Sequence, residues 1–187
     1  MSGSTTMTWW AMTDTRVLTR RQRYNIKQKD SELLPFSICC VNFEHDGNLG
    51  FLIRSAACFG AQTVHVIGSV PTRRQLNPIS GSLYDYVKIR QHKNPRQFLD
   101  YSENKSLKLV SAEICEGSTD LPSYSFDFSK HVVVVVGNET TGIPVEILKN
   151  SDVVHIPMPG PGYCLNTAQA ANILLYEATS QYYKGTQ

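Results

Sequence analysis

Apolar residues along the chain fall into short runs that alternate with turn-forming and helical segments. The runs Phe36–Val41 and Thr63–Ile67 predict β-strands, and between them apolar positions recur at helical spacing over residues 48–60. Gly60 stands where the stop of this helix is expected. A strand, a helix and a second strand at this spacing predict a β-α-β unit.

The second half of the chain continues this pattern. Val132–Val136 is an unbroken run of β-branched residues, which is typical of a central parallel strand buried on both faces. The other predicted elements are strands near 86–89, over 107–114 and over 153–156, and helices near 79–85, over 95–101, over 144–149 and from Asn166 to about Tyr183. We expect one α/β domain over residues 36–187, with a mainly parallel sheet and flanking helices.

The composition is that of an ordinary globular domain, 41% hydrophobic and 18% charged over 187 residues. The longest apolar run is far shorter than a membrane span, and no basic region precedes a continuous apolar core near the start. The five cysteines are an odd number without CxxC spacing, which argues against a disulfide framework and a zinc site. We therefore expect a cytoplasmic protein with reduced thiols that binds neither a membrane nor a metal.

Positive charge is concentrated at the front of the chain. Residues 1–29 hold six bases and one acid, whereas the remainder holds twelve bases and fifteen acids. We treat residues 1–35 as a basic, partly disordered extension, with disorder over 1–8 and a short helix within 15–28. Such a leader can attract RNA, although from charge alone a solvated tail explains it better. A second basic set is either solvated surface or faces RNA: Arg73, Arg74, Lys88, Arg90, Lys93 and Arg96.

Two connections that follow predicted strands contain unusual polar residues. In open parallel sheets, ligands bind at the carboxyl ends of the strands. The first connection places Asn48 at a helix start and Arg54 on an otherwise apolar helix, where an arginine either snorkels to the surface or holds an anion or a ribose. The second follows Val132–Val136 and reads GNETTG over residues 137–142. Its carboxylate, Glu139, is either a cap or a functional group.

A third connection contains three prolines and two glycines within residues 157–162. These residues predict an irregular bend whose backbone N–H and C=O groups can face a ligand. Asn166 then occupies the position of a helix N-cap. Taken alone, a Pro-rich link that ends one strand and starts one helix is the simpler interpretation.

Common nucleotide-binding and hydrolase motifs are absent. GNETTG has the glycine interval of a phosphate-binding loop, but Gly142 is followed by Ile143 and Pro144 rather than by Lys and Ser or Thr. No GxGxxG follows a strand, which argues against a dinucleotide fold, and no GxSxG occurs, which argues against a serine hydrolase. The five histidines are scattered, which favours structural roles over metal binding.

In order, the segments NLGFLIR (48–54), GNETTGIP (137–144) and IPMPGPGYCLN (156–166) resemble the three motifs of the SpoU/TrmH-type RNA 2′-O-ribose methyltransferases in the SPOUT superfamily. Each motif alone is modest, but the ordered triple is highly specific, and the resemblance covers about residues 36–183. It implies a C-terminal trefoil knot and methyl transfer from S-adenosyl-L-methionine to a ribose 2′-hydroxyl of tRNA or rRNA. It also implies a homodimer.

The same resemblance assigns site residues. The cofactor-binding set is Gly137, Ile156 and Leu165, with Asn138, Gly142 and Met158 nearby, and the catalytic set is Arg54, Asn48, Glu139 and Asn166. Arg54 either positions the target phosphate and stabilises developing negative charge, or acts as the base; both roles stay open. The other three catalytic residues then hold Arg54 and the ribose in line with the methyl group.

The sequence departs from the family pattern at Cys164 and Ala168, where serines are common, and this weakens the hydrogen bonding expected around the third motif. We expect no separate N-terminal substrate domain of the kind that some members carry, and the basic extension is a candidate substitute. We favour tRNA as substrate because the protein is a compact single domain. The alternatives are an rRNA 2′-O-methyltransferase and a non-catalytic RNA-binding protein that retains the fold. A generic nucleotide-binding module explains the sheet but not the three motifs.

Overall fold

The computed structural model describes residues 19–29 and 31–186, and the chain divides into a unit that ends at Glu32 and a unit that begins at Leu33. The described part of the first unit contains one helix, α1 (Arg20–Lys29). This helix overlaps the one expected within residues 15–28. The disorder expected over residues 1–8 lies outside the described residues.

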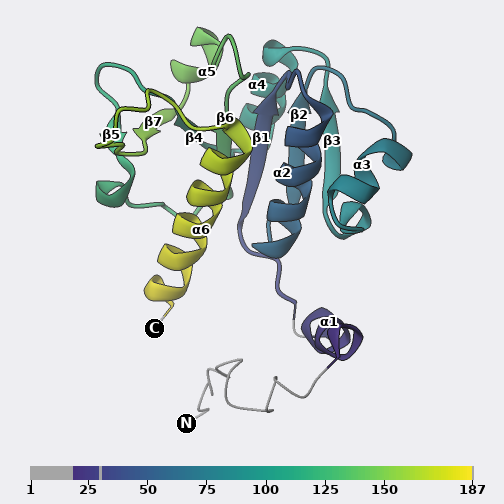
Figure 1. The fold of residues 1–187 in the computed structure, drawn as a ribbon. Coiled ribbons are helices and arrows are strands. Elements are labelled where there is room, and N and C mark those ends of the chain that lie inside the picture. Colours follow the sequence, from purple (N-terminus) through teal and green to yellow (C-terminus); the bar gives the residue numbers. More distant parts are fainter. Residues whose placement is uncertain (1–18, 30, 187) are drawn as a thin grey trace. The chain divides into compact units, whose positions relative to one another are not determined.

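The second unit is built on a seven-stranded sheet with the strand order β3-β2-β1-β6-β4-β7-β5 (Figure 1). The strands are β1 (Phe36–Val41), β2 (Thr63–Ile67), β3 (Lys88–His92), β4 (Lys108–Ala112), β5 (Thr119–Asp120), β6 (Val132–Val136) and β7 (Asp152–His155). All neighbouring strands in this sheet run parallel, which confirms the expected mainly parallel sheet. The unbroken valine run forms β6, which is fully buried between β1 and β4, as its β-branched sequence indicates.

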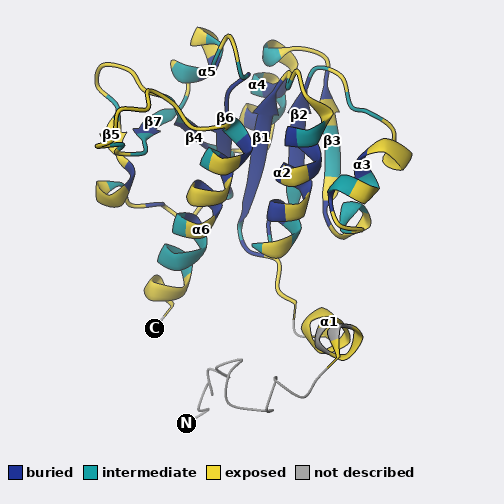
Figure 2. Cartoon of the chain, in the orientation of Figure 1, coloured by how far each residue is buried: buried dark blue, intermediate teal, exposed yellow. Residues whose placement is uncertain are grey.

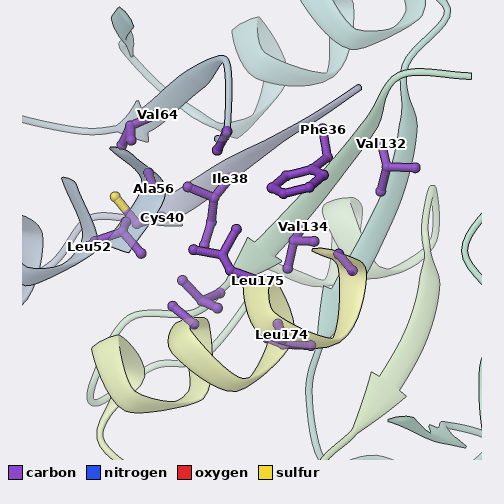
Figure 3. Packing of buried hydrophobic residues seen from close by; sticks show 14 of the residues in the cluster. Phe36, Ile38, Cys40, Leu52, Ala56, Val64, Val132, Val134, Leu174 and Leu175 are labelled. Carbon is purple, nitrogen blue, oxygen red and sulfur yellow. The ribbon is translucent and has the colours of Figure 1, made fainter. Parts of the chain in front are cut away.

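Helices cover both faces of the sheet. They are α2 (Asp46–Cys58), α3 (Arg73–Ile79), α4 (Pro95–Asn104), α5 (Val145–Leu148) and α6 (Thr167–Gly185), with short 3₁₀ turns η1 (Tyr84–Tyr86) and η2 (Leu121–Ser123). Side chains alternate along a strand, so Phe36 and Ile38 of β1 pack on one face with Leu174 of α6 (Figure 3). Cys39 packs on the other face with Phe98 of α4. Figure 2 shows the buried strands between helices that expose their outer surfaces.

Three elements differ from the sequence prediction. The helix predicted near 79–85 is wrong, because α3 begins earlier: the Gln75 side chain accepts a hydrogen bond from the N–H of Thr72 at 3.0 Å and so starts the helix there. The strand predicted near 86–89 begins two residues later, as β3. β5 was not predicted, since a strand of two residues is too short to give an alternating pattern.

The described residues provide neither a metal cluster nor a membrane helix. Over residues 19–29 and 31–186, no group of three or more His, Cys, Asp or Glu side chains is placed to hold a metal ion. No helix in that part of the chain is long and apolar enough to cross a membrane. His131, one of the scattered histidines, instead has its Nε2 atom 2.8 Å from Oγ of Ser37, which is a structural contact.

His65 on β2 and His92 on β3 form a buried pair. Nδ1 of His65 lies 3.0 Å from Nε2 of His92, and Phe98 lies edge-on against both rings. Burial, with a smaller contribution from the neighbouring His92, lowers the pKa of His65 to about 3. Burial, with a smaller contribution from Arg90, lowers the pKa of His92 to about 4. Both rings are therefore neutral near pH 7.

We expect the free energy of unfolding to fall as the pH drops from about 6.5 towards 4. In the unfolded chain histidine binds a proton near pH 6.5, whereas in the fold the pKa of His65 is about 3 and that of His92 about 4. The unfolded state binds more protons in this window, so each histidine lowers stability by up to about 1.4 kcal/mol per pH unit. Urea denaturation between pH 4.5 and 7.5 measures this slope. The variant His92→Gln should reduce the slope without abolishing it, because burial also lowers the pKa of His65 and of His131; an unchanged slope would contradict the assignment.

Candidate active site

Asn48, Glu139 and Asn166 form one hydrogen-bonded chain, although they come from three separate segments. Nδ2 of Asn48 donates to Oε1 of Glu139 at 2.5 Å, and Nδ2 of Asn166 donates to Oδ1 of Asn48 at 3.0 Å. Asn48 is buried in the first turn of α2, Glu139 follows β6, and Asn166 precedes α6. The three connections therefore meet at one edge of the parallel sheet, as their positions after strands predict.

Asn166 is fixed by the helix that it caps. Its Oδ1 atom accepts hydrogen bonds from the N–H groups of Ala168 at 2.9 Å and Gln169 at 3.4 Å. Because the amide oxygen takes the capping bonds, Nδ2 is left to donate to Asn48. The capping bond at Ala168 uses its backbone, so the alanine at this position leaves Asn166 fully held.

Glu139 receives a hydrogen bond on each carboxylate oxygen. Oε2 accepts from the backbone N–H of Glu44 at 3.0 Å, and Oε1 accepts from Asn48. Burial acts to raise the pKa of Glu139, but the hydrogen bonds from Glu44 and Asn48 outweigh it and hold that pKa below its ordinary value. Glu139 is thus a fixed, ionised acceptor. It orients the Asn48 amide with nitrogen towards itself and oxygen towards Asn166.

The β6–α5 loop is closed by backbone contacts that require two glycines. Asn138 and Gly142 exchange backbone hydrogen bonds at 3.0 and 3.1 Å, and Gly142 has a φ of +67°, which favours glycine. A Cβ on Gly137 would lie 2.6 Å from the carbonyl carbon of Gly142. Oδ1 of Asn138 also accepts from the N–H groups of Thr140 and Thr141, both at 2.8 Å. The loop therefore has one well-defined shape.

A cavity of about 570 Å³ lies among these loops. It is lined by all six residues that the resemblance assigns to the cofactor, namely Gly137, Asn138, Gly142, Ile156, Met158 and Leu165. Asn48, Glu139 and Asn166 line the same cavity, as does Cys164. Oγ1 of Thr167, another lining residue, is buried without a hydrogen-bond partner among the described residues. An unpaired hydroxyl and a glycine-shaped wall suit a polar, closely fitting ligand.

Arg54 lies apart from the Asn48–Glu139–Asn166 chain. Its side chain is exposed on α2, and Cζ lies 3.5 Å from the position that a Cβ on Gly81 would take. Arg54 lines a second cavity, of about 660 Å³, between α2 and α6. Asn48 and Asn166 border both cavities. The two asparagines therefore lie between the predicted cofactor residues and the predicted catalytic arginine.

Sequence reasoning missed Glu113, which directly follows β4 and lines the 570 Å³ cavity. Its carboxylate accepts hydrogen bonds from the N–H groups of Ile114 at 3.0 Å and Ile143 at 3.2 Å. The backbone N–H of Glu113 donates to the carbonyl of Val154 at 3.0 Å. Glu113 thus connects three strand-end segments. The predicted strand over 107–114 ran past Glu113, so the sequence did not place this carboxylate at a strand end as it placed Glu139.

The second basic set is partly paired within the chain. Arg73 forms an ion pair with Asp85, and Arg96 forms one with Asp100 at 3.0 Å. The guanidinium carbon of Arg90 lies 4.6 Å from the centre of a tyrosine ring. The ion pairs favour the interpretation of solvated surface at Arg73 and Arg96, whereas Arg90 is half-buried against the Tyr101 ring.

The fold and the site together define an α/β protein whose loops after β1, β4, β6 and β7 surround one cavity. The model of the SpoU rRNA Methylase family matches residues 35–176. The chain belongs to this family, which confirms the resemblance drawn from the three motifs.

Several characterised proteins are similar to this chain. A tRNA (guanosine(18)-2′-O)-methyltransferase of Aquifex aeolicus is 27% identical over 164 residues, covering 87% of this chain and 75% of the relative. A 23S rRNA (uridine(2479)-2′-O)-methyltransferase of Streptomyces viridochromogenes is 32% identical over 148 residues, covering 74% and 50%. The AdoMet-bound structure of an rRNA methyltransferase from Sinorhizobium meliloti superposes with a TM-score of 0.70 at 28% identity, covering 78% and 56%. The chain thus spans three quarters of the first relative and about half of the other two.

Proposed function

We propose that this chain is an enzyme that transfers a methyl group from S-adenosylmethionine to a ribose 2′-hydroxyl of RNA. The observation that carries the proposal is the hydrogen-bonded chain of Asn48, Glu139 and Asn166 on the wall of the 570 Å³ cavity. Membership of the SpoU rRNA Methylase family supports the same reaction, and the relatives in Aquifex and Streptomyces are named as tRNA and 23S rRNA 2′-O-methyltransferases.

The cofactor fits the 570 Å³ cavity. Gly137, Ile156 and Leu165 would hold it mainly through backbone groups, with Asn138, Gly142 and Met158 nearby, and all six line the cavity. The buried hydroxyl of Thr167 offers a further polar contact. When bound, S-adenosylmethionine supplies an electrophilic methyl group on a sulfonium. The related AdoMet-bound structure from Sinorhizobium meliloti supports this choice of cofactor.

The chain's own residues would align the ribose and stabilise the charge that develops on it. A ribose hydroxyl is a poor nucleophile and must lose its proton, here to solvent water, as the methyl group moves from the sulfonium to the oxygen. The Asn48 and Asn166 amides are preorganised by Glu139 and by the α6 N-terminus, so they orient the ribose without reorganising. Arg54 borders the adjoining cavity. Since a guanidinium keeps its proton in proteins, Arg54 acts as an electrostatic clamp on phosphate and developing oxyanion.

We favour tRNA over rRNA as the substrate, and the relatives include enzymes named for each. The runner-up function is a non-catalytic RNA-binding protein that retains the fold. One observation argues that the chain is catalytically active. Ala168 stands where a serine is usual, but Asn166 still caps the helix because it accepts from backbone N–H groups.

The assembly and location belong to the same proposal. Exposed apolar side chains on α2 and α6, namely Phe51 at 52%, Ile173 at 39% and Tyr176 at 62%, are suited to an interface between two copies of this chain. We therefore propose a homodimer in the cytoplasm. We also expect the segment from β7 to α6 to form the trefoil knot that the family resemblance implies.

Transfer assays on mixed RNA separate the two functions. The purified chain is incubated with methyl-labelled S-adenosylmethionine and with total tRNA or total rRNA lacking modification. We expect label in RNA and saturable cofactor binding. Cofactor binding without transfer to either RNA would favour the binding protein, and the absence of cofactor binding would contradict the proposal.

Deleting residues 1–29 tests the basic extension. We expect the shortened chain to bind RNA more weakly. The slope of log Kd against log salt concentration should also fall, by about 0.7 to 0.9 for each phosphate that the shortened chain no longer neutralises. Cofactor affinity should stay the same, because the cavity residues all lie after position 44. Filter binding at several salt concentrations measures the RNA affinity and its salt slope. If both stay unchanged, the extension is not part of the RNA-binding surface.

A further inference from the structure

The wall of the 570 Å³ cavity carries fixed negative charge. Within the described part of the chain, its lining residues include two carboxylates, Glu113 and Glu139, and neither a lysine nor an arginine. The lining, among the residues that the structure describes, also contains two histidines, His45 and His155. A pocket with this charge pattern favours a cationic ligand over a neutral ligand of the same shape.

Glu113 is held rigidly in that wall. One carboxylate oxygen accepts from the N–H of Ile114 and the other from the N–H of Ile143. The second oxygen also lies 2.7 Å from where a Cβ on Gly142 would be, so the carboxylate is seated against the glycine loop. Because both oxygens are tied to backbone groups, the charge stays in place when the cavity fills, and it needs no reorganisation to act on a ligand.

Glu113 stands apart from the catalytic network. Glu139 is engaged by Asn48 and by the backbone of Glu44, so its charge is coupled to the residues that orient the ribose. The Glu113 carboxylate instead accepts its hydrogen bonds from backbone groups of the β4 and β6 connections. The Glu113 and Glu139 carboxylates therefore share no hydrogen-bond partner among the described residues.

We infer that Glu113 is a specificity-determining residue, whose charge makes the cavity prefer the sulfonium cofactor over the neutral thioether that remains after methyl transfer. This inference rests on the proposed function. When the methyl group leaves, the sulfur keeps the bonding electron pair and loses its positive charge. S-Adenosylhomocysteine therefore has the shape of the cofactor without the charge that Glu113 attracts, and product release is favoured over product retention.

The test compares the affinities of the two forms in four chains. Calorimetry gives Kd for S-adenosylmethionine and for S-adenosylhomocysteine with the unmodified chain, Glu113→Gln, Glu113→Asp and the matched control Glu116→Gln. Glu116 is an exposed acid three residues further on, outside the cavity lining. For Glu113→Gln, we expect the Kd of S-adenosylhomocysteine divided by the Kd of S-adenosylmethionine to fall by about 3-fold to 30-fold. Glu113→Asp and Glu116→Gln should keep the ratio close to that of the unmodified chain.

The outcomes are distinct. An unchanged ratio of the two Kd values in Glu113→Gln would overturn the inference. If both Kd values rise equally, Glu113 only supports the loop; if neither changes, Glu113 does not act on the ligand. Failure of the unmodified chain to bind S-adenosylmethionine would overturn the proposed function itself, whereas normal binding with an unchanged ratio rejects only the role of Glu113.

Discussion

Replacing Arg54 with alanine is expected to reduce methyl transfer by about 100-fold to 10,000-fold, the range typical of groups that stabilise charge or move protons in a transition state. Kd for S-adenosylmethionine should change little. The reason is spatial: Arg54 lies on the exposed side of α2 and lines the 660 Å³ cavity, whereas the predicted cofactor residues line the 570 Å³ cavity. Single-turnover kinetics and calorimetry on the same preparation measure the two effects separately.

Two further variants sharpen the test of Arg54. Arg54→Lys keeps the charge but loses the planar fork of donors, so partial activity would indicate a role that depends mainly on charge. Arg96→Ala removes an exposed arginine that pairs with Asp100 and lines neither cavity, and it serves as the matched control. Full activity of Arg54→Ala would remove Arg54 from the mechanism.

Replacing Gly137 with alanine is expected to weaken cofactor binding by about 5-fold to 150-fold, since overpacking a tightly packed position costs about 1–3 kcal/mol. The added Cβ would lie 2.6 Å from the carbonyl carbon of Gly142, 2.8 Å from its Cα and 2.9 Å from the nitrogen of Ile143. These atoms are backbone and cannot rotate away, so the β6–α5 loop must shift and the cavity wall must move with it.

Gly160 provides the control for Gly137. A Cβ at Gly160, in the Pro-rich bend, would meet no described atom within 4 Å, so Gly160→Ala should bind S-adenosylmethionine as the unmodified chain does. Calorimetry with both variants measures the difference, and circular dichroism checks that each is folded. Equal cofactor affinities for the two variants would contradict the geometry assigned to the loop.

The fold was predictable wherever a single segment carried its own signal. The valine run of β6 and the apolar runs of β1 and β2 are dense enough to define strands without tertiary information. The start of α3 was not predictable from apolar spacing, because a capping interaction between Thr72 and Gln75 sets it. β5 exists only because β7 lies beside it in the sheet.

The site was predictable to the extent that strand ends meet at one edge of a parallel sheet. That rule, together with the three motifs, brings Asn48, Glu139 and Asn166 together. The position of Arg54 follows from helix geometry: at about 100° per residue, six positions place it about 120° around α2 from Asn48. Glu113 was missed because its role arises from contacts with Ile143 and Val154, which are distant in sequence. The roles of all these residues in catalysis stay predictions.

The central claim is that the methyl group goes to a ribose 2′-oxygen of RNA. The most direct measurement incubates the chain with labelled S-adenosylmethionine and unmodified tRNA or rRNA transcripts, then identifies the labelled nucleoside by mass spectrometry. We predict that the mass of one methyl group lies on the ribose, and that the adjacent phosphodiester resists alkali because its 2′-hydroxyl is blocked. A methyl group found on a base, or cofactor binding without any transfer to RNA, would contradict this claim.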